Sequence, residues 1–529
     1  MTGAYNVGMD LSELLAALSD PAAYPRPAPV EVRQTHISAV FLVGDTVYKI
    51  RKPVRLGFVD FGTLEKRKHD CDEEVRLNRR LAPGVYRGVV PITVEGGKGR
   101  VGGAGEPIEW AVEMVRLPED ATLNARLARD EVTAEQIERV ALRIADFHRT
   151  SERGVHVSRF GHFDFVVGNA RENFTQAAGH VGLTIGQQVY DRCRELTEQA
   201  LGDLKPLIDS RAARGVPCDT HGDLHLSHVY LFPDRPPPDD LVIIDCIEFA
   251  ERFRFADPVA DIAFLVMDLA FHGRRDLAGA CANAYFVASG DEEGRRLLPF
   301  YVAYRAVVRA KVEGMQAREP EVPEDERVCR RYSAHAHWRL ALGTLEDPLR
   351  RSAVVLVGGL PGTGKSTLSR ALARAANFTV IRSDEIRKEL AGVPVTERAA
   401  ECYTPEWTEL TYSECLRRLR TALDTGGRVI VDASFAQEAH RALFLEEAGQ
   451  ARAPAVFLVC RAEPQLVRER LRARRGDASD ADERVYDELA AKWEPDDARY
   501  ERQTVEIDTT DAEAATRAAI EVLKRAGLS

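Results

Sequence analysis

Several short stretches near the start of the chain have a β-like pattern, with apolar and β-branched residues in runs of strand length. These stretches are residues 39–43, 46–50, 88–94 and 110–115. A helical period covers residues 64–81, and from residue 134 the pattern is mainly helical. The pattern therefore predicts a small β-rich lobe followed by a larger helical lobe.

One hairpin is predicted within the helical part. Residues 229–232 and 241–244 are apolar, and the loop 233–240 between them is rich in proline and aspartate. Such turn residues between two strand-like runs favour an antiparallel pair. The hairpin places the sequences before and after it close together.

Beyond residue 351, buried strands and helices alternate, which predicts an α/β domain with a parallel sheet. A chain of 529 residues is too long for a single core. We expect a domain at residues 1–345 and a second at residues 351–529, and there is no internal repeat. The expected strands and helices of the second domain are residues 353–357, 366–376, 378–381, 429–432, 455–459, 504–507 and 512–526.

The most specific motif follows the first of these strands. The run 359–366, Gly-Leu-Pro-Gly-Thr-Gly-Lys-Ser, fits the Walker A pattern G-x-x-x-x-G-K-[ST] at every fixed position. Its glycines turn backbone N–H groups toward phosphates, Lys365 reaches the β and γ oxygens, and the Ser366 hydroxyl holds magnesium. The predicted nucleotide-binding residues are Gly359, Pro361, Gly362, Thr363, Gly364, Lys365, Ser366 and Thr367.

Three further residues of the second domain complete a predicted phosphotransfer site. Asp384 follows a strand, at the edge where α/β sheets bind ligands, and Arg387 lies three residues further on. We expect Asp384 to act as base for an acceptor hydroxyl and Arg387 to hold the acceptor. The alternative is a helix cap and a surface arginine. Asp432 ends the third strand and is expected in the magnesium shell; the residue after it is alanine, which disfavours a hydrolysing motor.

Arginines are dense after the fourth strand of the second domain. Arg468, Arg472 and Arg475 share a helical face. Guanidinium groups neutralise the charge of a transferred phosphoryl group, so Arg468 and Arg472 are predicted in a lid over the phosphates. A solvated helix is the alternative.

The helical lobe of the first domain carries three acidic clusters, at residues 221–228, 243–245 and 257–263. Phosphoryl transfer needs one carboxylate to orient the attacking hydroxyl and another for magnesium. The predicted hairpin would bring the carboxylates of Asp223 and Asp245 to the entrance of one site. These segments resemble the catalytic loop, metal-binding aspartate and D-P-x-x-D-[IL]-A helix of the aminoglycoside phosphotransferase-like branch of the protein-kinase-like fold.

The resemblance implies a role for each matching residue. Asp223 would be the catalytic base, His221 would brace its loop, Asp261 would support it, and Asp245 would bind magnesium. Lys49 resembles the strand lysine that pairs with the α and β phosphates. Its ion-pair partner would be Glu74 or the neighbouring Glu73, and the adenine-facing hinge, residues 113–117, would include Met114 and Val115.

Two departures from that family matter. His228 stands where asparagine is usual as the second metal ligand, and no glycine-rich loop precedes Lys49. Magnesium prefers oxygen to nitrogen. The first domain could therefore be a weak kinase, a kinase with altered metal preference, or a binding module. A rival interpretation takes His221, His225 and His228 as zinc ligands on one helix face.

The second domain resembles P-loop kinases of the polynucleotide-kinase, zeta-toxin and gluconate-kinase kind, through the Walker A run, S-D-x-x-R and the arginine-rich segment. Together the resemblances identify a fusion of an aminoglycoside phosphotransferase-like domain, an α+β bilobal fold, with an AAA-type P-loop kinase. The implied function is a bifunctional phosphotransferase that uses ATP or GTP, magnesium and a hydroxyl acceptor. One active kinase with a regulatory domain, or a kinase of nucleic-acid ends, are the alternatives.

Composition restricts the partners. With 45% hydrophobic and 29% charged residues and a net charge of −11, general affinity for nucleic acid or anionic membrane is not expected. The nine cysteines form no C-x-x-C pair, and neither a secretory leader nor a membrane span is evident. We expect a cytoplasmic protein without an obligate protein partner, acting on a hydroxyl-bearing small molecule or a nucleic-acid end.

Overall fold

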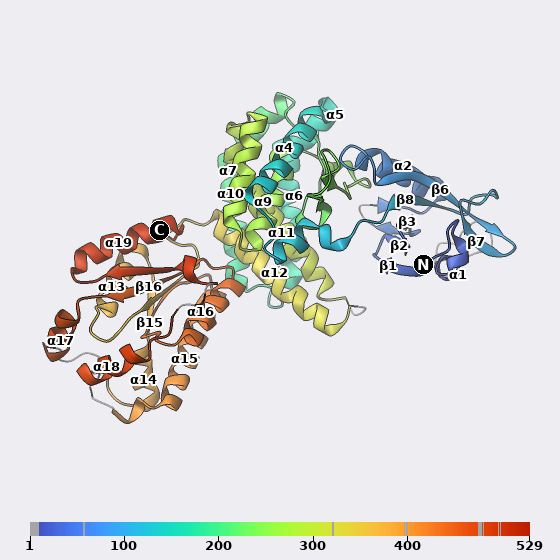
Figure 1. The fold of residues 1–529 in the computed structure, drawn as a ribbon. Coiled ribbons are helices and arrows are strands. Elements are labelled where there is room, and N and C mark those ends of the chain that lie inside the picture. The colour runs from blue at the N-terminus through green and yellow to red at the C-terminus, as the bar shows by residue number, and fades with distance from the viewer. Residues whose placement is uncertain are drawn as a thin grey trace. The chain divides into compact units, whose positions relative to one another are not determined.

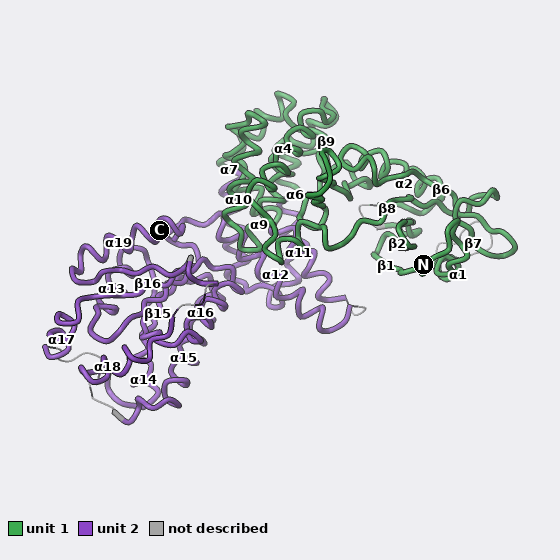
Figure 2. Tube along the Cα trace, viewed as in Figure 1, with its two compact units in different colours: residues 1–169, 202–305 green, residues 170–201, 306–529 purple. Residues whose placement is uncertain are grey.

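The structure, a computed structural model, divides into two compact units, each described separately below. Unit 1 comprises residues 1–169 and 202–305, and unit 2 comprises residues 170–201 and 306–529 (Figure 2). The residues described are 10–528, except for 57–58, 320–321, 396, 398–399, 474–478, 480, 496 and 498.

Unit 1 begins with a small lobe built on an antiparallel sheet of order β1-β2-β3-β8-β6-β7 (Figure 1). The predicted strands are present: β3 alternates between buried and partly exposed positions along most of its length, whereas β2 is buried at nearly every position, including Phe41. Two short strands, β4 (Arg55–Leu56) and β5 (Val59–Asp60), form a separate pair. The other elements are α1 (Leu11–Leu18), β1 (Val30–Gln34), β2 (Ser38–Val43), β3 (Thr46–Arg51), α2 (Leu64–Asn78), β6 (Tyr86–Glu95), β7 (Lys98–Val101) and β8 (Glu109–Val115).

The large lobe of unit 1 is helical, with two short strand pairs that position its loops. The predicted hairpin is confirmed as β10 (Val229–Leu231) paired with β11 (Leu241–Ile243). The second pair is β9 (Cys218–Asp219) with β12 (Phe255–Ala256). The helices are α3 (Leu123–Ala128), α4 (Ala134–Thr150), α5 (Val155–Ser158), α8 (Glu251–Arg254), α9 (Pro258–Phe271) and α10 (Arg275–Ser289). This lobe and the small lobe give unit 1 a protein-kinase-like architecture.

The division into units does not follow the predicted boundary near residue 345. It falls inside three helices, α6 (Phe163–Ala177), α7 (Gln187–Ala213) and α11 (Leu298–Gln316). The reason is packing around α12 (Glu324–Leu345), whose Trp338 is fully buried against the rings of Phe174 and Tyr190. The ion pair of Arg192 with Glu346, 2.7 Å, adds to this cluster. These helical segments therefore belong to the compact body of unit 2.

The rest of unit 2 is the predicted α/β domain, a five-stranded parallel sheet of order β14-β15-β13-β16-β17 (Figure 1). Its central strand is buried throughout because helices cover both faces. The elements are β13 (Ala353–Gly358), α13 (Lys365–Ala376), β14 (Thr379–Arg382), α14 (Ser383–Ala391), α15 (Pro405–Asp424), β15 (Arg428–Asp432), α16 (Glu438–Gln450), β16 (Ala455–Arg461), α17 (Pro464–Ala473), α18 (Glu483–Ala491), β17 (Thr504–Asp508) and α19 (Ala512–Arg525).

Among the described residues, every helix is too short or too polar to span a bilayer.

Candidate functional site

Lys49 is the centre of the candidate site in unit 1. It lies on β3, and its Nζ is 2.9 Å from Glu74 Oε1 and 3.1 Å from Asp245 Oδ1. Of the two glutamates considered for this pairing, the structure selects Glu74, since Glu73 binds Arg76 instead. Burial lowers the pKa of Lys49, but the two carboxylates raise it by more, so the ammonium stays charged. The small lobe thereby presents a fixed positive charge beside Asp245.

A second cation, which the sequence analysis missed, lies two residues along the same strand. Arg51 is 1% exposed and donates hydrogen bonds to Asp70, Glu74 and Glu248. Burial raises the pKa of Glu248 to about 8, with the nearby carboxylate of Glu74 adding to the shift against the attraction of Arg51. Arg51 therefore ties α2, β3 and the segment after Asp245 into one buried network.

The loop that carries Asp223 is held in place by Asp261 on α9. Its Oδ2 accepts the backbone N–H of His221 at 3.0 Å, and its Oδ1 accepts that of Gly222 at 2.9 Å. His148 donates from Nε2 to the same carboxylate at 3.0 Å. Burial raises the pKa of Asp261, but these donors outweigh it and hold the pKa at about 2. The supporting role expected for Asp261 matches these contacts.

His221 itself faces the hairpin rather than a metal. Its Nε2 donates to the backbone oxygen of Ile244 at 2.9 Å, and its Nδ1 accepts the N–H of Asp223 at 3.3 Å. Both ring nitrogens are thus engaged within the loop. Residues 226–228 form a single 3-10 turn and not an α-helix. The three histidines therefore do not share a helix face, and the zinc interpretation that required one is wrong.

His225 and His228 nevertheless approach each other, with ring centroids 3.8 Å apart. The Nε2 of His228 lies 3.4 Å from Asp245 Oδ2, and the Nε2 of His225 lies 3.6 Å from Asp223 Oδ2. Burial and the neighbouring His225 lower the pKa of His228 to about 4, so its ring is neutral at neutral pH. Asp223, His225 and His228 are close enough to share an ion.

The other parts of unit 1 that were expected to face a nucleotide are the turn between β1 and β2 and the end of β8. A short turn, residues 35–37, connects β1 to β2 where protein kinases carry a glycine-rich loop. Met114 and Val115 form the end of β8, paired with Val47 and Thr46 of β3. The expected hinge therefore begins at the end of an interior strand of the sheet, and its adenine-facing role stays a prediction.

In unit 2 the Walker A loop connects β13 to α13 and wraps the start of that helix. Gly359 has φ +135°, and a Cβ there would come within 2.6 Å of the Cys460 backbone oxygen. Gly364, with φ +95°, caps α13. Only glycine fits such positions without strain. Lys365 Nζ donates to Leu360 O at 3.0 Å, which keeps the ammonium folded over the loop.

The predicted magnesium shell of unit 2 already contains a positive group. Arg382, at the end of β14, donates from Nη2 to Ser366 Oγ at 3.1 Å, and its Nε lies 3.3 Å from Asp432 Oδ2. Glu385 binds its third nitrogen at 2.7 Å. Burial raises the pKa of Asp432, against the opposing effect of Lys365 and Arg382. Hydroxyl and carboxylate oxygens are the donors magnesium prefers, so this pair fits the ion.

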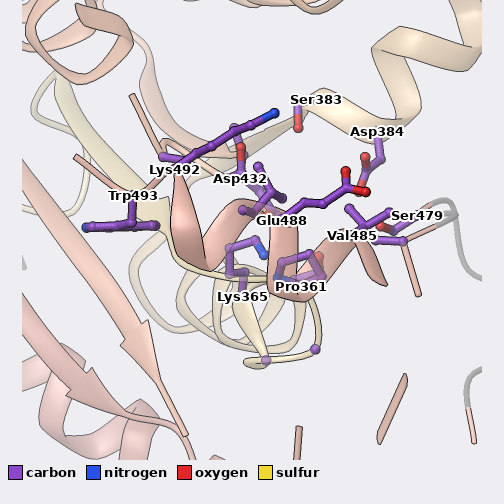
Figure 3. A pocket seen from close by; sticks show the side chains of 18 of the residues that line it. Pro361, Lys365, Ser383, Asp384, Asp432, Ser479, Val485, Glu488, Lys492 and Trp493 are labelled. Atoms are coloured by element: carbon purple, nitrogen blue, oxygen red, sulfur yellow. The ribbon is translucent and has the colours of Figure 1, made fainter. Parts of the chain in front are cut away.

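A cavity of about 1350 Å³ opens beside the loop, and Lys365, Asp384 and Asp432 line it (Figure 3). Arg387, also in its lining, is 7% exposed and donates from Nη1 to Cys402 O at 2.7 Å. Among the described residues, no hydrogen-bond partner is present for its Nε. Because α14 begins at Ser383, Asp384 lies in its first turn and is not the cap. The interpretation of Arg387 as a surface arginine is wrong.

The lid prediction has a different outcome. Arg468 binds Asp487 at 3.0 Å and Arg472 binds Glu483 at 2.6 Å, and neither arginine lines the cavity. Arg475 lies outside the described residues. Of the described arginines of α17, the one that lines the cavity is Arg470, which the sequence analysis passed over.

Arg470 is fixed by the loop after β17. Its Nη2 donates to the backbone oxygens of Thr509 at 3.1 Å and Thr510 at 3.0 Å. The Nη1 is buried without a hydrogen-bond partner in the part of the chain that the structure describes, and it lies next to Gly364. Thr509 in turn donates to Thr363 O. Arg470 is two positions from Arg468 and from Arg472, about half a helical turn, so it projects from the opposite face of α17 and meets the phosphate loop.

Comparison with known proteins gives matches for both parts of the chain. A family model described as an AAA domain matches residues 354–495. The uncharacterized protein Rv2004c of Mycobacterium tuberculosis is 32% identical over 470 residues, covering 88% of this chain and 90% of that protein. A gluconokinase from Sinorhizobium meliloti matches 33% of this chain and 93% of its own, with 22% identity and TM-score 0.26. Aminoglycoside 2′-phosphotransferase-IIIa, solved with GDP, matches 58% and 92%, with 16% identity and TM-score 0.37.

Proposed function

The chain belongs to the family of the mycobacterial protein Rv2004c, and for this two-part chain we propose a bifunctional phosphotransferase. Each part transfers the γ-phosphoryl group of ATP or GTP to the hydroxyl group of its own acceptor. The observation that supports the proposal is that the chain has two separate clusters of a lysine with carboxylates: Lys49 with Glu74 and Asp245 in unit 1, and a cavity lined by Lys365, Asp384 and Asp432 in unit 2. The cytoplasm, with its nucleoside triphosphates and magnesium, is the proposed location.

In unit 1, the proposed roles follow the contacts of the catalytic loop. Lys49, held by Glu74, binds the α and β phosphates, while Asp223 accepts the proton of the attacking hydroxyl. Asp245 offers an oxygen to the metal ion. A divalent ion held by Asp245 would neutralise charge on the phosphate groups. Asp261 keeps the loop in place through two backbone hydrogen bonds, so Asp223 needs little reorganisation before transfer.

In unit 2, the Walker A loop and Lys365 bind the phosphates, and Ser366 and Asp432 hold magnesium. Arg470 aims its unpartnered Nη1 at the phosphate loop and takes the role first expected of Arg468 and Arg472. Asp384 lies across the cavity from this loop and accepts the proton of the acceptor hydroxyl (Figure 3).

The acceptor of unit 2 is proposed to be a small molecule with an anionic group beside its hydroxyl. A buried guanidinium with an unused N–H is costly to leave unpaired, and a carboxylate or phosphate satisfies it best. Arg387 is such a group, and it is stacked over Tyr403 with 4.8 Å between guanidinium and ring centre. A nucleic-acid end also supplies a phosphate beside a hydroxyl, so it remains within this class.

The test is transfer from γ-labelled ATP and GTP to a mixed metabolite and oligonucleotide extract. Wild type is compared with Asp223→Asn and Lys365→Ala, and Asp130→Asn and Lys524→Ala serve as matched exposed controls. The expected result is that each site variant loses a different labelled product while the controls lose none. If Lys365→Ala abolishes all labelling and Asp223→Asn changes nothing, unit 1 is not a kinase and the bifunctional proposal fails.

A further inference from the structure

The orientation of His228 is fixed by one hydrogen bond. Its Nδ1 lies 2.9 Å from the backbone oxygen of Asp223. A carbonyl oxygen only accepts hydrogen bonds, so Nδ1 carries the hydrogen. In the neutral ring the other nitrogen, Nε2, then holds a lone pair and is the free donor atom for a metal ion.

That lone pair faces a carboxylate. His228 Nε2 is 3.4 Å from Asp245 Oδ2, and the His228 side chain is only 15% exposed. A ring nitrogen and a carboxylate oxygen so close together in a largely buried place require a positive charge between them, which either a proton or a metal ion supplies. A separation of 3.4 Å suits two ligands that share one ion with bonds of about 2.0–2.2 Å.

Asp245 is held ready for such an ion. Lys49 binds its Oδ1 at 3.1 Å, which leaves Oδ2 directed at His228. The backbone of Asp245 has φ +64°, in the left-handed region that non-glycine residues seldom adopt. Strain of this kind occurs where a site fixes a side chain for function.

We propose that His228 and Asp245 bind a divalent first-row transition-metal ion in preference to magnesium. The inference rests on the proposed function of unit 1 and names the cofactor of that site. Magnesium selects oxygen ligands, whereas an imidazole nitrogen beside a carboxylate favours transition metals. The histidine in place of asparagine is therefore a change of metal preference and not a loss of the site.

The neighbouring histidine has a different task. His225 Nδ1 accepts the backbone N–H of Ser227 at 3.3 Å, so its hydrogen is on Nε2. That hydrogen points toward Asp223 Oδ2, 3.6 Å away. His225 is thus a positioning residue for the base, and its ring supports His228. Because the Nε2 of His225 carries a hydrogen, it is not a ligand in the proposed site. The proposed site therefore differs from one in which Asp223, His225 and His228 share an ion.

The first experiment asks whether nitrogen binds the metal. Mn²⁺ and ADP are added to the full chain carrying Lys365→Ala, which weakens the nucleotide site of unit 2, and pulsed electron paramagnetic resonance records ¹⁴N coupling to Mn²⁺. Coupling is expected with His228 present and with His225→Asn, and it is expected to vanish in His228→Asn. Circular dichroism checks that each variant is folded.

The second experiment measures selectivity. Isothermal titration calorimetry gives the dissociation constants of Mn²⁺ and Mg²⁺, and their ratio is compared between His228→Asn and the parent. The ratio of the two dissociation constants is expected to shift toward Mg²⁺ in His228→Asn, because asparagine restores an oxygen donor.

Three results overturn the assignment: failure of Mn²⁺ to bind the parent, bound Mn²⁺ without ¹⁴N coupling, or coupling lost in His225→Asn but kept in His228→Asn. None of these readouts depends on turnover. A nitrogen-bound ion in a protein that labels no product would remove the proposed function and leave the metal assignment standing.

Discussion

In unit 1 the cation expected to face a nucleotide, Lys49, lies between two carboxylates that come from distant parts of the chain. In unit 2 the phosphate-binding groups belong to one contiguous loop whose glycines adopt left-handed backbone angles. The first site is therefore an assembly of side chains, which a fold can adapt one residue at a time. The second is a backbone shape, which depends on its glycines. This contrast is consistent with the departures of unit 1 from the kinase pattern that it resembles, whereas the Walker A run fits its own pattern at every fixed position.

The largest effect expected from this contrast is on the folding of unit 1. Replacing Arg51 by Met leaves the buried carboxylates of Asp70, Glu74 and Glu248 without their shared partner, which costs about 3–5 kcal/mol. Hydrogen exchange followed by mass spectrometry should show faster exchange in β3 and α2, with β13 unchanged.

Arg33→Met is the matched control, because Arg33 pairs with Glu31 and Glu119 at the surface, where such pairs contribute about 0–1 kcal/mol. Equal effects of the two substitutions would mean that the buried network does not hold unit 1 together.

The next effect concerns chemistry in unit 2. Lys365→Ala should lower the rate of transfer at this site by about 10²–10³-fold, because one charge aimed at the phosphates is removed. The unit 1 product should be unaffected. Steady-state rates for both labelled products test this, with the exposed Lys524→Ala as control. A similar fall in both products would show that the two sites are not independent.

A third effect is a pH dependence confined to the small lobe of unit 1. Glu109 is fully buried, and burial raises its pKa from 4.5 to about 7 despite Arg67 at 2.7 Å. A raised pKa in the folded state stabilises the protein below the unfolded value and loses that contribution as pH rises through the folded one. The stability of the lobe should fall by up to about 3 kcal/mol between pH 4.5 and 7.

Exchange rates in β8, measured across that range, test the pH dependence. Glu109→Gln should flatten it, and Glu95→Gln, an exposed carboxylate of the same sheet, should leave it as it is. An unchanged slope in Glu109→Gln would assign the dependence to another group.

The smallest effect distinguishes the arginines of α17. Arg470→Ala should weaken nucleotide binding to unit 2 by about 1.5 kcal/mol, roughly tenfold in dissociation constant. Arg468→Ala should change it by less than about 1 kcal/mol, since that side chain is engaged with Asp487 at the surface. Calorimetric titration with ADP compares the two. The reverse order would restore the lid prediction in its original form.

Sequence prediction succeeded for the contiguous loop of unit 2 and was less complete for the side chains that unit 1 assembles from distant segments. The Walker A loop and the parallel sheet were predictable because their information is contiguous or periodic. The pairing of Lys49 with Glu74 came only through the resemblance to kinases. Nothing local in the sequence marks Arg51 or Glu248, which meet across 197 positions of the chain.

Arg382 was missed for a related reason. It lies opposite Asp432 only because β14 and β15 are neighbours in register, and strand order is not written in the sequence. The prediction for the arginines of α17 failed for a different reason. A shared helical face does not show which face of the helix meets the phosphate loop. Helical spacing grouped His225 with His228, and their rings do lie together. They meet across a 3-10 turn, however, and not on the face of an α-helix.

The guanidinium that joins Ser366 to Asp432 has a further consequence for unit 2. A metal ion that bound to these oxygens would have to replace Arg382, a positive group that the protein supplies itself. Binding of the metal ion would then replace one positive group by another, and the displaced Arg382 would become available to an incoming phosphate. Nucleotide and metal ion would accordingly enter this site as a pair more readily than either would alone.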